Sequence, residues 1–94
     1  MKCFELGRMV CTRGIAEKMD GDSEFASFVN KSLAKYIKRD WGNTCDDDKK
    51  ANDEAIKTGE RILAVYSSDK LKTKIWIITE WDRSVTTILF PSEY

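Results

Sequence analysis

Hydrophobic residues are concentrated in the C-terminal third of the chain. Residues 74 to 94 read KIWIITEWDRSVTTILFPSEY, two β-branched and aromatic segments on either side of a short polar stretch. This pattern predicts strands over 74–79 and 84–90, joined by a hairpin turn over 80–83 of the type I kind. Residues 61–67, RILAVYS, predict a third strand of the same composition. Because the connections between the three are short, we expect an antiparallel meander.

The N-terminal half has the spacing of helices after one short strand. Residues 4–12 alternate loosely and predict a strand interrupted by Gly7, where a bulge or a close approach of backbone is expected. A helical turn or two should follow over 15–19. Residues 24–38 carry apolar side chains at the i, i+3, i+4 spacing of a helix with one buried stripe. A third helix is expected from a cap at Thr44 or Asp46 to about Thr58, with Gly59 as its C-terminal stop.

The order of elements is strand, two or three helices and three strands, with no repeat or linker between them. The sequence therefore predicts one α+β domain over residues 1–94, written β-α-α-α-β-β-β. It should contain a four-stranded, largely antiparallel sheet with helices packed on one face.

The third helix has an unusual inward side. Its apolar stripe is weak, and helical spacing places Asp48 and Asn52 on the same side as Ala51 and Ala55. An unpaired buried amide or carboxylate costs about 1–3 kcal/mol. We therefore expect both polar side chains to have partners across the fold.

Both faces of the two C-terminal strands are apolar. Ile75 and Ile77 alternate with Trp76 and Ile78, and the last strand behaves in the same way. One face should lie under the helices. The other face is covered either by a second copy or a partner protein, or by helices and the N-terminal strand wrapped around the sheet.

Composition removes several classes of function. Sixteen basic and sixteen acidic residues cancel, which disfavours direct binding of nucleic acid. With no histidine and three cysteines that form no C-x-x-C pair, we expect no metal site, no cofactor and no disulfide framework. Nothing resembles a membrane span or a secretory signal, so we expect a cytoplasmic protein.

A polar constellation drawn from distant positions is the candidate binding site. Two arginines framed by aromatic rings suit a phosphate or a nucleotide, and paired carboxylates beside an arginine suit acid and base catalysis. The alternative is a structural network that holds the third helix on the sheet. No residue is assigned a catalytic role. The candidates for ligand or partner binding are Trp41, Asp48, Asn52, Arg61, Tyr66, Glu80, Trp81, Asp82, Arg83 and Ser84.

Four segments together resemble a known family. They are LGRMVCTRGIAE (6–17), RDWGNTCDDDKKANDEA (39–55), GERILAVY (59–66) and KIWIITEWDRSVTTILFPSEY (74–94). The family consists of small uncharacterised proteins of plasmids, conjugative elements and prophages, often labelled plasmid-related proteins and sometimes mislabelled as a type I restriction modification subunit. Trp81 stands where the family more often has alanine, and Ala-Val-Tyr at 64–66 replaces a more usual Ser-Ala-Tyr.

The resemblance implies a setting on a mobile genetic element. Small accessory proteins of such elements often inhibit host defence, so the first hypothesis is a non-enzymatic binder of a restriction or CRISPR-type effector. The second hypothesis is a sponge that sequesters a nucleotide signal. The third is a small enzyme that uses the Asp, Glu and Arg side chains of the constellation.

Overall fold

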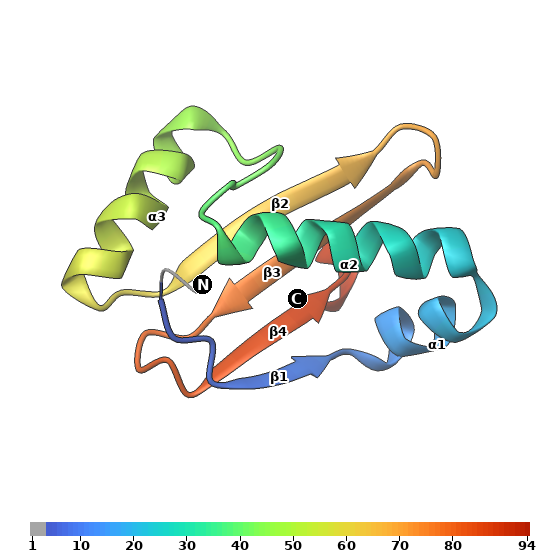
Figure 1. Cartoon of the computed structure of the whole chain (residues 1–94), viewed down its shortest axis with the longest axis horizontal. Helices are drawn as coiled ribbons and strands as arrows, with labels where there is room; N and C mark the ends of the chain where they lie inside the picture. The colour runs from blue at the N-terminus through green and yellow to red at the C-terminus, as the bar shows by residue number, and fades with distance from the viewer. Residues whose placement is uncertain (1–3) are drawn as a thin grey trace.

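The helices of the protein pack on one face of a four-stranded mixed sheet (Figure 1). The structure is a computed structural model and describes residues 4–94. Its elements are β1 (Arg8–Cys11), α1 (Arg13–Gly21), α2 (Ser23–Ile37), α3 (Asp46–Thr58), β2 (Ile62–Ser68), β3 (Thr73–Thr79), β4 (Val85–Leu89) and the 3-10 helix η1 (Pro91–Glu93). The predicted α+β class and order of elements are confirmed.

The strands lie in the order β1-β4-β3-β2. β2, β3 and β4 form the expected antiparallel meander, whereas β1 pairs in parallel with β4. The N-terminal strand therefore extends the sheet at one edge, and the alternative in which it wraps the second face is wrong. Figure 1 shows α2 lying across the sheet, α3 beside β2, and α1 beyond the end of β1.

Two predicted elements differ from the observed ones by more than one residue at an end. The first strand begins only after Gly7, which has a φ of 65°. A Cβ at Gly7 would collide with the backbone of Arg83 and Ser84, so this glycine permits the close approach that the sequence predicts. The first helix has nine residues rather than one or two turns.

The turn over 80–83 is confirmed. The amide of Glu80 donates to the carbonyl of Val85, and the amide of Arg83 donates to the carbonyl of Glu80. Arg83 occupies the left-handed region with a φ of 59°.

A chain of buried hydroxyl groups joins the helix layer to the centre of the sheet. The Tyr36 hydroxyl of α2 lies 2.6 Å from that of Thr79, which lies 2.8 Å from the hydroxyl of Thr86. Thr86 Oγ1 donates to the carbonyl oxygen of Leu6 at 2.7 Å. Burial raises the pKa of Tyr36, which keeps this phenol protonated as a partner for Thr79. These hydrogen-bonded hydroxyl groups thus hold α2, β3, β4 and the segment before β1 together.

The sheet surface turned away from the helices is largely apolar, and we call it the open face. Cross-strand register places Leu63, Ile78, Thr87 and Val10 in one row across all four strands. Ile78 and Leu89 are only 3% and 5% exposed even though the helices lie on the other side. The central part of the open face consists of Val10, Leu63, Val65, Trp76, Ile78, Val85, Thr87 and Leu89, and the same register places Arg8, Ser67 and Lys74 at its margins.

Removal of the Thr86 hydroxyl should destabilise the protein. Thr86→Val leaves the Leu6 carbonyl and the Thr79 hydroxyl short of a buried partner, which should lower the free energy of unfolding by about 1–3 kcal/mol. Thr87→Val is the matched control, because the Thr87 hydroxyl makes no hydrogen bond within residues 4–94. Urea unfolding measures the free energy of unfolding of both variants. An equal decrease in the two would contradict a stabilising role of the buried hydroxyl groups.

Candidate functional site

The ten candidate residues do not form one site. Three of them, Trp41, Asn52 and Tyr66, lie at the outer edge of β2. Five others, Arg61, Glu80, Asp82, Arg83 and Ser84, lie around the hairpin between β3 and β4. Trp81 is exposed at the tip of the same hairpin, and Asp48 is exposed on α3 and belongs to neither group.

Asn52 of α3 serves as a substitute for a neighbouring strand. Its Nδ2 donates to the carbonyl of Leu63 at 2.8 Å, and its Oδ1 accepts from the amide of Leu63 at 3.2 Å. The segment before α3 continues this pairing. The amide of Val65 donates to Thr44 Oγ1, the amide of Asn43 donates to the carbonyl of Val65, and the amide of Ser67 donates to Asn43 Oδ1. The prediction that Asn52 faces inward with a partner is confirmed.

Asp48 does not face inward, so that prediction is wrong. Its side chain is exposed in the first turn of α3, where unpaired backbone amides favour carboxylates. α3 contacts β2 through Asn52 and Ala55, which are buried, and Asp48 lies one turn before this contact. An unpaired carboxylate in the core would also cost more free energy than an amide.

Trp41 and Tyr66 are core residues. Trp41 is 3% exposed, and its Nε1 donates to Asp53 Oδ1 of α3 at 3.0 Å. Tyr66 is 2% exposed, and its hydroxyl donates to the carbonyl of Asp40 at 2.7 Å. Burial raises the pKa of Tyr66. Neither ring is free to stack on a base.

Arg83 ties the hairpin to the end of α3. Its Nη2 donates to the carbonyl of Ala55 at 2.8 Å, and its Nη1 donates to the carbonyls of Glu60 and Glu80 at 2.7 and 3.1 Å. The carbonyl of Ala55 belongs to the last turn of α3, where a cation is favoured by the helix dipole. The guanidinium group thus caps the helix with donors that a phosphate ligand would need.

Asp82 and Ser84 close the hairpin turn. The amide and the hydroxyl of Ser84 both donate to Asp82 Oδ1, at 3.0 and 2.6 Å. These bonds, the one from the hydroxyl first, lower the pKa of the Asp82 carboxyl. A lowered pKa does not suit a general acid near neutral pH. Trp81, at the tip of the turn, is 65% exposed.

The C-terminal segment lies against the open face through Tyr94. Its ring packs on Trp76 with centroids 5.4 Å apart, and its hydroxyl accepts from Arg61 Nη1 at 2.7 Å. Arg61 Nε also lies 3.8 Å from Glu80 Oε1. The sequence-based prediction included Arg61 and Glu80 but missed Trp76 and Tyr94. An aromatic residue shortly after the Pro91 that ends the last strand was the available signal.

Glu93 anchors the same segment to the start of α1. Its carboxylate accepts from the hydroxyl of Thr12 at 2.6 Å and from the amides of Gly14 and Phe90 at 3.2 and 3.0 Å. The bond from Thr12 is the main cause of the lowered pKa of Glu93. The end of the described chain is therefore fixed on two sides.

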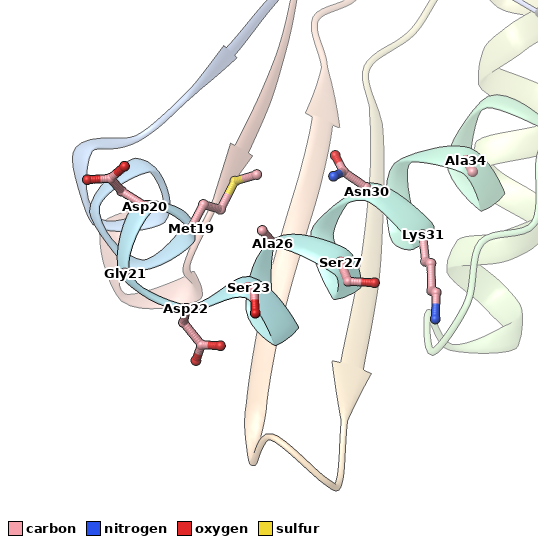
Figure 2. A pocket seen from close by; sticks show the side chains of 10 residues that line it. All are labelled: Met19, Asp20, Gly21, Asp22, Ser23, Ala26, Ser27, Asn30, Lys31 and Ala34. Atoms are coloured by element: carbon pink, nitrogen blue, oxygen red, sulfur yellow. The ribbon is translucent and has the colours of Figure 1, made fainter.

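A broad surface hollow of about 840 Å³ contains none of the ten candidates. Figure 2 shows its lining side chains along one side of α2 and at the junction of α1 and α2. Most of them are small or polar, such as Ser23, Ala26, Ser27 and Asn30. The hollow is wide open to solvent, so a ligand there would leave much of its surface exposed.

Residues 4–94 contain neither a metal site nor a membrane-spanning helix of the kinds described next. No group of three or more cysteine, aspartate or glutamate side chains is placed to hold a metal ion. In the same range, no helix has the length and apolar character needed to cross a bilayer.

Comparison of the chain with protein-family models, with curated proteins and with solved structures found no match. The resemblance to plasmid-related proteins thus stays a prediction, and the geometry of the chain alone has to support a function.

Asn52→Ala should destabilise the protein, because it leaves backbone groups at the edge of β2 without hydrogen-bond partners. Loss of the amide removes partners from both the N–H and the C=O of Leu63, which should lower the free energy of unfolding by about 1–3 kcal/mol. Hydrogen exchange of the Leu63 amide should become faster. The control is Asn30→Ala on α2, an exposed position where a change within about 0.5 kcal/mol is expected. Equal effects in the two variants would argue against the role of Asn52 as a hydrogen-bonding partner for the edge of β2.

Arg83→Ala should weaken the fold through the end of α3. Loss of three charge-assisted hydrogen bonds should lower the free energy of unfolding by about 1.5–3 kcal/mol, and Arg83→Lys should fall between because one ammonium cannot span the three carbonyls. Arg13→Ala is the control, since its pair with Glu17 is at the surface and contributes about 0.3–0.5 kcal/mol. If Arg83→Ala unfolds at the wild-type urea concentration, the capping role is refuted.

Proposed function

We propose that this protein is a non-enzymatic binding protein of a mobile genetic element, and that it modulates a host defence system by docking on a protein component of that system. The observation that carries the proposal is the open face. Its central row runs across four strands, six of its eight central side chains are half-buried and two are buried, and the C-terminal segment packs on it through Tyr94.

The composition of the open face and its border favours a protein partner. Leu63, Val65, Val85 and Trp76 are half-buried, so each still has apolar area to lose on binding. Tyr94 beside the face and Trp81 at the hairpin tip are 66% and 65% exposed. Tyrosine and tryptophan are the residues that most often dominate the free energy of protein association.

The hydrogen bonds of the arginines support a protein partner over a nucleotide. Arg83 donates to three backbone carbonyls, and Arg61 donates to Tyr94 while pairing with Glu80. A phosphate would have to replace these partners, which lowers its net affinity. For catalysis, the lowered pKa of Asp82 gives no support to the use of this carboxyl as a proton donor.

The defence setting comes from the resemblance to plasmid-related proteins, with a restriction or CRISPR-type effector as the expected partner. The site of action would be the cytoplasm. Blocking such an effector requires a stable surface contact rather than turnover. A small rigid domain with one apolar face meets that requirement.

A charge at the centre of the open face should abolish the function. Thr87→Arg adds a bulky cation to the middle row without removing an apolar side chain, and should weaken binding to the purified effector by at least about tenfold. It should also remove the gain in transfer of the element into a host that carries that effector. Lys35→Glu, an exposed change on α2 on the other side of the sheet, is the control and should retain both properties.

Thermal unfolding should first establish that both variants are folded. Equal transfer into defended and undefended hosts, with and without the gene, would refute the defence role. Retained binding by Thr87→Arg would refute the open face as the docking surface. A melting temperature raised by a nucleotide would instead favour the sponge.

A further inference from the structure

The two edges of the sheet differ in whether their outward backbone groups have hydrogen-bond partners. β2 and β1 are the edge strands of the order β1-β4-β3-β2. The outer edge of β2 receives five hydrogen bonds from Asn43, Thr44 and Asn52. Figure 1 shows no helix or strand beside β1 on the side away from β4. An edge with unpaired backbone groups is a template for another strand.

The register of β1 identifies which backbone groups point outward. The amide of Arg8 donates to the carbonyl of Ser84, and the amide of Thr12 donates to the carbonyl of Ile88. Even-numbered residues of this segment therefore direct their amides towards β4, and Met9 and Cys11 direct theirs to the outer edge. Within residues 4–94, the amides and carbonyls of Met9 and Cys11 have no hydrogen-bond partner.

An apolar hollow lies next to this edge. It has a volume of about 180 Å³ and is lined by Met9, Val10 and Cys11 of β1, Met19 of α1, Val29 and Asn30 of α2, and Ile88 of β4. Met9 and Cys11 are opposite Thr86 and Ile88 in the register, so their side chains point to the helix side of the sheet. Met9 is 40% exposed, which leaves a flexible apolar side chain at the mouth of the hollow.

We infer that a second copy of this chain binds at the outer edge of β1, so that two β1 strands pair antiparallel about a two-fold axis at Val10. In this register Val10 faces its own copy and Met9 faces Cys11 of the other copy. Met9 and Cys11 then exchange both of their backbone hydrogen bonds in each pair, which gives four bonds across the axis.

The side chains fit the same arrangement. Met9 of each copy stands opposite Cys11 of the other on the helix side, at the hollow that Cys11 helps to line. Each copy thus fills the hollow of its neighbour with a side chain that is exposed in the single chain. The dimer has one continuous eight-stranded sheet, and the two open faces become one surface. This arrangement does not depend on the function proposed above.

A disulfide at position 10 tests the register directly. In a background with serine at positions 3, 11 and 45, Val10→Cys places two thiols in a pair without hydrogen bonds across the axis, where Cα atoms are about 4.5 Å apart. Mild oxidation should give a covalent dimer. Thr87→Cys in the same background is the control, because Thr87 lies on β4, one strand away from the edge.

Met9→Lys gives an independent measurement in the native-cysteine chain. It places a charge at the apolar mouth twice per dimer, and the dissociation constant from sedimentation equilibrium should rise at least about tenfold. The melting temperature of the monomer should change by only a few degrees, because Met9 is 40% exposed in the single chain and a lysine can extend into solvent from there. A wild-type protein that stays monomeric up to about 100 µM would overturn the inference, since association weaker than that corresponds to less than about 5.5 kcal/mol. Equal or faster cross-linking of Thr87→Cys would overturn it in favour of dimerisation through the open face.

Discussion

The need to pair backbone groups at the outer edge of β2 explains much of the N-terminal half of the fold. A strand at this position leaves every second amide and carbonyl unpaired unless other groups reach it. Asn52 supplies both a donor and an acceptor at the right separation, so one side chain pairs as a residue of a neighbouring strand would. The position of α3 follows from this, because the helix has to run beside the strand at the distance that an asparagine side chain can span.

The same constraint explains why polar residues that resemble a binding site are structural. Arg83 and Asn52 are among the groups that a ligand site would use, and both are occupied with main-chain atoms. A small domain has few apolar residues to spare for holding its helices. Here α3 buries only Asn52 and Ala55, so hydrogen bonds and the Arg83 cap replace much of the packing that a longer apolar stripe would give.

Local patterns in the sequence were sufficient to predict the meander, α2 and the turn over 80–83, because each of these depends on residues close together in the chain. They were also sufficient for Asn52. The patterns failed for Asp48. A helical projection assigns Asp48 and Asn52 to the same side of α3 and cannot show where along the helix the contact with β2 begins. The parallel pairing of β1 with β4 joins residues almost eighty positions apart, and no periodicity encodes it. Likewise, the contact of Tyr94 with Trp76 depends on how the chain turns after Pro91.

The pairing of β1 with β4 has a consequence for the order of folding. The meander and α3 depend on contacts within residues 41–89, whereas β1 has no partner strand until residues 85–89 have been synthesised. Closure of so long a loop is entropically costly and slow compared with formation of a hairpin. On the ribosome, β1 therefore stays without its partner strand until the residues up to Leu89 have been synthesised, and its pairing with β4 completes the four-stranded sheet.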